Sequence, residues 1–192
     1  DVLTRRSELL EHDFGCLMWY TFALHDDPKY DAEAFNPVIH DAFWMGIAED
    51  NDPMHVAREC YWSRLGKFPP LEDFCPTVWC HSIPDPSYAP PGFHTANNEQ
   101  LGPPASAHTE REWLEIKKKY AEDLITVWQR HAPNMTWDNI IGVDSNSPYD
   151  CLRMKNLAPN SSIGIIDRVP HQCEEKRPTP ELANHRTPIK NL

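Results

Sequence analysis

The first long apolar run of the chain spans residues 14–24 and reads FGCLMWYTFAL. Polar residues bound it, with Asp13 directly before the run and His25 directly after it. Its short length and its aromatic content favour a buried β-strand over a helix. Because the run lacks polar alternation, both of its faces are expected to be covered, either by the core on both sides or by a ligand on one side.

Apolar residues at helical spacing predict three helices. The first covers residues 36–50, where Asn36 is the expected N-cap and Pro37 lies in the first turn. The second covers residues 52–64 and also starts with a capping residue followed by proline. The third covers residues 110–131 and shows the clearest apolar face.

Two later segments read as strands. Residues 77–83 and 93–99 are the arms of a predicted hairpin, and the proline-rich residues 84–92 form the turn between them. The expected fold class is therefore α+β, with a mixed sheet that carries helices on one face. Residues 177–192 are proline-rich and lack periodicity, a composition that is stable only against another surface.

The charge balance excludes two classes of partner. The 192 residues include 18 Lys and Arg against 29 Asp and Glu, which gives a formal net charge of −11. Proteins that bind nucleic-acid phosphates or anionic membrane surfaces need a binding surface rich in Lys and Arg. No apolar run approaches the roughly 20 residues of a membrane span, so no transmembrane segment is expected. The chain opens on Asp1 rather than on Met, which suggests a fragment or a processed subunit.

The cysteines do not form a recognisable framework. They are Cys16, Cys60, Cys75, Cys80, Cys151 and Cys173. Without a secretory leader or a short disulfide-rich scaffold, reduced thiols and a cytoplasmic location are expected. Cys75, Cys80 and His81 are possible zinc ligands by type, but their spacing is not that of a zinc knuckle, and no metal is expected.

Motifs of several enzyme classes are absent from the sequence. It contains no GxGxxG fingerprint, no phosphate-binding P-loop, no GxSxG nucleophile elbow and no HExxH pair. The chain therefore carries no dinucleotide or phosphate loop of its own.

Four segments together carry a family resemblance. They are FNP at residues 35–37, DPSYAPPGFHT at residues 85–95, a YAEDL helix ending in HAPN at residues 120–134, and the stretch from Gln172 to Leu192. In this order they resemble phytoene desaturase-like FAD-dependent oxidoreductases, which include carotenoid desaturases, carotenoid isomerases and retinol saturases. The family's opening Rossmann-type segment and its closing Gly-rich flavin motif are missing. The chain is thus similar to the internal, substrate-binding portion of the family.

The resemblance implies a division of the chain and a shared cofactor. Residues 1–160 correspond to a substrate-binding lobe, and residues 161–192 to an extended segment that leads into the flavin-binding domain. FAD is then shared with partner chains that carry the Rossmann-type segments. The residues implied to lie near the flavin are His171, Gln172, Arg186, Thr187 and Pro188.

The resemblance also gives candidate site residues and an activity. The aromatic candidates for a hydrophobic substrate pocket are Trp19, Tyr20, Phe22, Phe43 and Trp44, and ordinary core packing is the alternative for each. His81, His94 and His171 are weak candidates for catalytic proton transfer. The expected function is that of a dehydrogenase or desaturase subunit, inactive without its partners, which positions the substrate against the flavin. The alternatives are a non-catalytic binding or assembly subunit and, third, a stand-alone hydrolase or lyase that uses His and Asp.

Overall fold

The computed structural model describes residues 4–5, 8–11, 16–49, 51–156, 169–173, 176 and 182–183. Its centre is a five-stranded sheet with the strand order β2-β3-β4-β1-β5. The strands are β1 (Cys16–Leu24), β2 (Trp44–Gly46), β3 (Thr77–Trp79), β4 (His94–Gly102) and β5 (Ile140–Asn146). The α+β class is confirmed. The expectation of a mixed sheet is wrong, because every neighbouring pair in this sheet is antiparallel.

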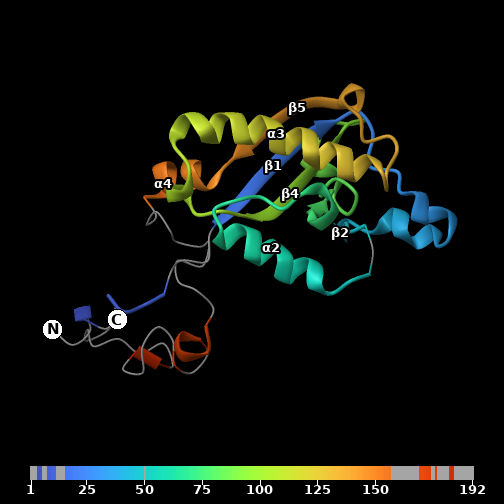
Figure 1. Ribbon diagram of the computed structural model, residues 1–192. Coiled ribbons are helices and arrows are strands. Elements are labelled where there is room, and N and C mark those ends of the chain that lie inside the picture. The colour runs from blue at the N-terminus through green and yellow to red at the C-terminus, as the bar shows by residue number, and fades with distance from the viewer. Residues whose placement is uncertain are drawn as a thin grey trace.

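Helix α3 (Glu110–Gln129) lies across one face of the sheet (Figure 1) and confirms the helix predicted there. It begins at a capping box, in which the Thr109 side chain accepts the Glu112 N–H and the Glu112 carboxylate accepts the Thr109 N–H. Its sheet-facing stripe consists of Trp113, Tyr120, Leu124, Val127 and Trp128, all buried. None of the helices in the described ranges is both long and apolar enough to cross a membrane.

Strand β1 divides its side chains between the two faces of the sheet. Successive residues of a strand point to opposite sides, so every second residue of β1 faces α3. On that side Tyr20 stacks on Tyr120 with 4.9 Å between ring centroids, and Phe22 meets Trp128 edge-on at 6.0 Å. Trp19, the residue before Tyr20, belongs to the opposite face and is only half-buried.

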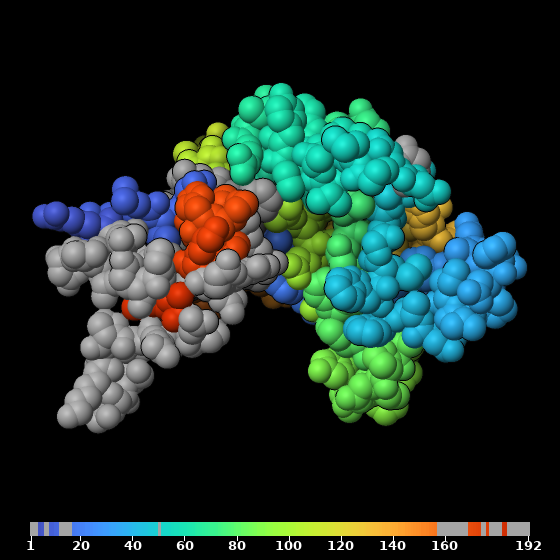
Figure 2. Space-filling model, turned by 90° about the horizontal axis from the view of Figure 1, so that it is seen from below, coloured from blue at the N-terminus to red at the C-terminus, as the bar shows by residue number. Residues whose placement is uncertain are grey.

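In the view from below in Figure 2, α2 lies at the margin of that opposite face, and the green residues of β3 and β4 stay visible beside it. The strand register aligns two rows of side chains across it. One row runs through Trp44, Trp79, Asn97, Thr21 and Asp144, and the next through Gly46, Thr77, Glu99, Trp19 and Asn146. We call this side the open face. Its indole side chains lie on a surface that an isolated sheet normally leaves polar.

The predicted helix at residues 36–50 is wrong over most of its length. Asn36 does cap a short 3-10 helix, η2 (Pro37–Asp41), with its side chain accepting the Val38 N–H. The chain then extends, and Trp44 pairs with Trp79 as part of β2. Pairing with β3, a segment distant in sequence, overrides the local helical spacing.

Helix α2 (Met54–Arg64) confirms the second predicted helix and stands at the margin of the open face. Asp52 accepts the Met54 N–H at 2.9 Å and so starts the helix. The Ser63 hydroxyl donates to the Gly102 carbonyl at 2.9 Å, which fixes α2 beside the end of β4, beyond the point where β3 stops. Helix α4 (Pro148–Lys155) follows β5.

The hairpin of β3 and β4 is confirmed, and its turn explains the DPSYAPPG stretch. The Asp85 side chain accepts the Ser87 N–H at 2.9 Å and opens a short 3-10 helix, η4 (Pro86–Tyr88). Gly92 closes the turn with φ of 82°, a left-handed conformation that a side chain would strain. The boundary expected between residues 160 and 161 lies outside the described residues.

Candidate functional site

A hollow of about 650 Å³ lies on the open face, with α2 at its margin. Its floor comes from β1, β3 and β4, and its walls come from β2, α2 and the residues that precede β3. The side chains that line it are Leu17, Trp19, Phe43, Trp44, Glu59, Cys75, Thr77, Trp79, His81, Asn97, Glu99, Gln100 and Leu101. Apart from His81, no basic side chain is among these lining residues. We refer to this feature as the tryptophan hollow.

Three indole rings give the hollow its character. The Trp79 ring lies between the other two, 6.0 Å from the Trp19 ring and 6.4 Å from the Trp44 ring, measured between centroids. The planes are nearly perpendicular in both pairs, at 84° and 78°. Edge-to-face packing of this kind fixes the rings relative to one another. The hollow therefore offers rigid aromatic walls in more than one orientation.

The rim of the hollow is unusually apolar for a free surface. Trp44 is 65% exposed and Phe43 is 42% exposed. His81 contacts the rings of Phe43, Trp79 and Tyr88, the last in a stacked arrangement at 5.1 Å. Large aromatic side chains that gather on one surface usually mark a binding site, because their exposure to water is unfavourable.

Two carboxyl groups enter the hollow from different elements. Glu59 comes from the buried side of α2, and Glu99 comes from the centre of β4. Burial raises the pKa of Glu59 to about 7, although the hydrogen bond from Gln100 works in the opposite direction. Burial also raises the pKa of Glu99. Both groups are more easily protonated than ordinary surface carboxylates, because desolvation disfavours the charged form.

A chain of polar side chains connects Glu59 to the core beneath the sheet. The Gln100 amide donates to the Glu59 carboxylate, and the Gln100 carbonyl oxygen accepts from the Tyr120 hydroxyl at 2.8 Å. The same hydroxyl lies 2.9 Å from Oδ1 of Asn98, whose amide donates to the Thr77 carbonyl at 3.1 Å. Each of these buried polar groups has a partner, which holds the Glu59 carboxyl in a fixed position.

The structure separates the five predicted pocket residues into two groups. Trp19, Phe43 and Trp44 line the tryptophan hollow. Tyr20 and Phe22 face α3 instead, and they must be removed from the pocket assignment. The Tyr20 hydroxyl donates to the Lys117 carbonyl of α3 at 2.7 Å, and the Phe22 ring is completely buried. The reason is the two-residue period of the strand, which places neighbours on opposite faces.

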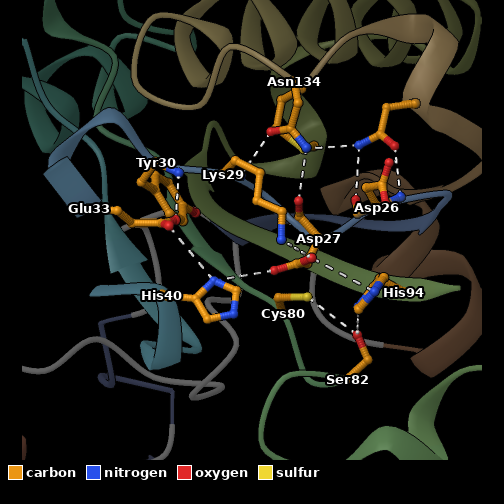
Figure 3. Close-up of polar contacts among 12 residues, drawn as sticks. Asp26, Asp27, Lys29, Tyr30, Glu33, His40, Cys80, Ser82, His94 and Asn134 are labelled. Carbon is orange, nitrogen blue, oxygen red and sulfur yellow. Dashed lines mark hydrogen bonds and ion pairs between the residues drawn. The ribbon is translucent and has the colours of Figure 1, made fainter. Parts of the chain in front are cut away.

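The three candidate histidines lie in three different environments. His81 lines the tryptophan hollow. His171 is exposed and pairs with Glu11, with 3.2 Å between His171 Nε2 and the carboxylate, and it is not a lining residue of the hollow. His94 belongs to a separate polar cluster around Asp27, drawn in Figure 3.

That cluster contains a Ser-His-Asp arrangement. Ser82 Oγ lies 3.1 Å from His94 Nδ1, and His94 Nε2 lies 3.8 Å from the Asp27 carboxylate. Ser82 is buried, and its hydroxyl oxygen also accepts the Thr95 N–H at 3.1 Å. A nucleophile needs an accessible oxygen. The arrangement therefore fastens the base of the β3–β4 hairpin, and it gives no support to the hydrolase alternative.

The rest of the Asp27 cluster joins two loops. The Asn134 amide donates to the Asp27 carbonyl at 2.9 Å, and its carbonyl oxygen accepts the Lys29 N–H at 2.8 Å. The Lys29 ammonium contacts the Asp27 carboxylate at 2.6 Å, with His40 on the other side at 3.8 Å (Figure 3). The HAPN segment that ends α3 thus holds the loop after β1.

The residues implied to lie near a flavin are only partly described. The Gln172 side chain is buried and bonds both backbone groups of Glu11, accepting its N–H at 3.0 Å and donating to its carbonyl at 2.9 Å. Both the oxygen and the nitrogen of its amide are therefore engaged within the chain. Arg186, Thr187 and Pro188 lie outside the described residues. Because His171 is exposed and paired with Glu11, and Gln172 is bonded to the Glu11 backbone, the described members of this set do not fit FAD as its main holder.

Cys75, Cys80 and His81 are possible metal ligands by residue type. No group of three or more His, Cys, Asp or Glu side chains that could hold a metal ion occurs among the residues the structure describes. Cys80 is buried and contacts Ser82, with 3.4 Å between Sγ and Oγ, whereas Cys75 lines the hollow.

Comparison with known proteins gives no assignment. No protein-family model matches the chain, and no curated protein matches it significantly. The resemblance to the phytoene desaturase-like family therefore depends on the four segments themselves.

Trp79, Glu59 and Glu99 are among the lining residues of the hollow that sequence reasoning missed. Trp79 lies in a correctly predicted strand, and its alternation with Val78, which is buried, was the signal that placed it on the other face. Glu59 and Glu99 carried no such signal, because a glutamate on a helix or in a polar strand normally faces water.

Proposed function

We propose that this chain is the substrate-binding lobe of an FAD-dependent oxidoreductase of the phytoene desaturase-like type, with the flavin held by other polypeptides. The observation that carries the proposal is the tryptophan hollow on the open face of the sheet, where Trp44 is 65% exposed. An exposed apolar surface of this kind is stabilised when a second surface covers it, because apolar area left in water is unfavourable by about 25 cal/mol per Å². A partner that carries the flavin supplies such a covering surface.

The chain's own contribution is binding and orientation. Trp19, Trp44 and Trp79 provide flat apolar surfaces that exclude water from a hydrophobic substrate. Bound FAD would supply the redox chemistry at a carbon–carbon or similar bond. Since the described members of the implied flavin set, His171 and Gln172, do not fit FAD as its main holder, the chain is expected to be inactive without its partners, and we assign no chemical step to it alone.

The first test is purification of the tagged chain with its natural partners under native conditions. The expected result is a complex with a flavin absorption spectrum, together with intact-mass peaks of the companion chains. A purified complex without flavin would refute the oxidoreductase proposal.

A second experiment distinguishes the lobe of an enzyme from an assembly subunit. Anaerobic bleaching of the flavin by an apolar extract of the source cells reports on substrate oxidation. Trp19→Ala and Phe43→Ala should slow this bleaching, whereas Trp137→Ala should not, since Trp137 is half exposed but lies outside the hollow. If all three variants assemble and bleach like the unmodified complex, the chain is a non-catalytic subunit.

A further inference from the structure

We propose that the tryptophan hollow selects an apolar molecule that carries a positive charge, such as an alkylated ammonium group, over neutral and anionic molecules of the same shape. This names a substrate class for the hollow and rests on the proposed function in so far as the hollow is the substrate site. The inference depends on three features: the arrangement of indoles, the two carboxyl groups, and the absence of lysine and arginine from the lining residues.

The indoles are arranged as a cation site requires. An ammonium group is attracted to the face of an aromatic ring, and tryptophan gives the strongest attraction. Because Trp79 is nearly perpendicular to both Trp19 and Trp44, the three rings present faces in different directions within one hollow. Purely apolar ligands are held equally well by aliphatic side chains, yet only Leu17 and Leu101 are aliphatic among the lining residues.

The charged groups of the hollow are negative. Glu99 lies directly across the strand pair from Trp19, so its carboxyl is adjacent to the indoles, and Glu59 enters from α2. The other titratable lining groups are Cys75, whose thiol pKa is raised by burial, and His81. Among the residues that the structure describes, no cationic side chain pairs with either carboxyl, and Glu59 is bonded by the neutral Gln100 amide.

A bound cation supplies the counter-charge that these carboxyls lack. Burial disfavours the ionised form of both, and a positive charge a few ångströms away favours it again. Binding of a cation is therefore coupled to loss of a proton and should tighten as the pH rises through the pKa of Glu59, about 7. A neutral ligand has no such coupling.

The experiment titrates the full chain with a matched pair of probes. Benzyltrimethylammonium carries the charge, and neopentylbenzene has the same shape without it. Binding is followed by indole fluorescence and by calorimetry at pH 6 and at pH 8. We expect the cation to bind about tenfold more tightly than the neutral probe at pH 8 and to lose much of this advantage at pH 6.

Conservative variants identify the groups responsible. Glu99→Gln and Trp79→Phe should each weaken binding of the cation by about threefold to tenfold while leaving the neutral probe nearly unchanged. Glu59→Gln should remove most of the pH dependence. The controls are Glu115→Gln and Trp137→Ala, both on exposed side chains outside the hollow, which should bind both probes normally. Circular dichroism of each variant checks that it is folded.

The outcomes separate this inference from the proposed function. If the neutral probe binds as tightly as the cation and Glu99→Gln changes nothing, selection for a cation is refuted, while an apolar substrate hollow still stands. If Trp79→Ala, which removes the whole ring, weakens the binding of neither probe, the hollow is not a substrate site, and both proposals fail. Cation binding that is unaffected by every hollow variant would show attraction to the acidic surface and would also refute the inference.

Discussion

Replacing Glu59 by glutamine should stabilise the protein at neutral and alkaline pH. Glu59 is 7% exposed, and its carboxylate accepts a hydrogen bond from the Gln100 amide. Glutamine has the same shape and keeps an oxygen for that bond, but it carries no charge. The variant therefore imitates the protonated form of Glu59 at every pH.

The size of the effect follows from the pKa. Burial raises the pKa of Glu59 from an ordinary 4.5 to about 7, so between these values the folded protein holds a proton that the unfolded chain has released. The unfolding free energy then falls as the pH rises across this window and becomes level above it. The total loss is about 3 kcal/mol, at 1.36 kcal/mol for each pKa unit. Glu59→Gln avoids the loss.

The assay is urea denaturation of the full chain and of the variant at several pH values from 4 to 9. The difference in unfolding free energy should be near zero at pH 4, grow between pH 4.5 and pH 7, and stay near 3 kcal/mol above pH 7. Other groups also make the stability depend on pH. Asp150 is one, because its bonds to Ser147 and Lys117 lower its pKa in spite of burial. Their contributions are the same in variant and parent and cancel in the difference. Glu72→Gln, at an exposed position, is the control. A difference that is flat with pH would refute the argument that Glu59 is buried without a counter-charge.

Three further predictions concern stability. Tyr120→Phe should cost about 1–3 kcal/mol in urea denaturation, because it removes the single hydroxyl proton that the buried oxygens of Gln100 and Asn98 share; a neutral effect would contradict the polar chain described above. Ser82→Ala should cost a similar amount without changing flavin bleaching by the native complex, and a complete loss of bleaching in a folded variant would revive a catalytic role. Thr109→Ala should cost about 1 kcal/mol by removing the cap of α3, which thermal unfolding followed at 222 nm measures; an unchanged midpoint would show that the cap is not needed.

The elements that the sequence predicted correctly are those with local signals. Helix α3 has a capping box and a stripe of apolar residues at helical spacing, and α2 has a capping aspartate followed by proline. The hairpin has a turn whose conformation follows from its aspartate, proline and glycine residues. In each case the information lies within a few residues of the element that it determines.

The errors arose where a distant partner decides the structure. Strand β2 has three residues, and its pairing with β3 comes from a segment more than thirty positions away. Which residues of the central strands face the core could not be predicted for a different reason. In β4 the buried residues include Asn98 and Gln100, so alternation of apolar and polar side chains, which normally reveals the inner face, is missing. Because the two faces of the sheet could not be told apart in the sequence, Tyr20 could not be distinguished from Trp19 as a pocket residue.

The polar core and the tryptophan hollow are two sides of the same sheet, and the same side chains connect them. Gln100 and Asn98 face α3, where Tyr120 bonds them, and Gln100 also reaches the Glu59 carboxyl at the hollow. An apolar core would hold the strands at least as well, because buried polar networks add little net stability. What this network adds is a fixed position for a carboxyl that destabilises the fold above pH 7 and has no counter-charge until a cation binds. If Glu59→Gln both stabilises the chain and abolishes the pH dependence of cation binding, the two effects have one physical cause, the desolvation of that carboxyl.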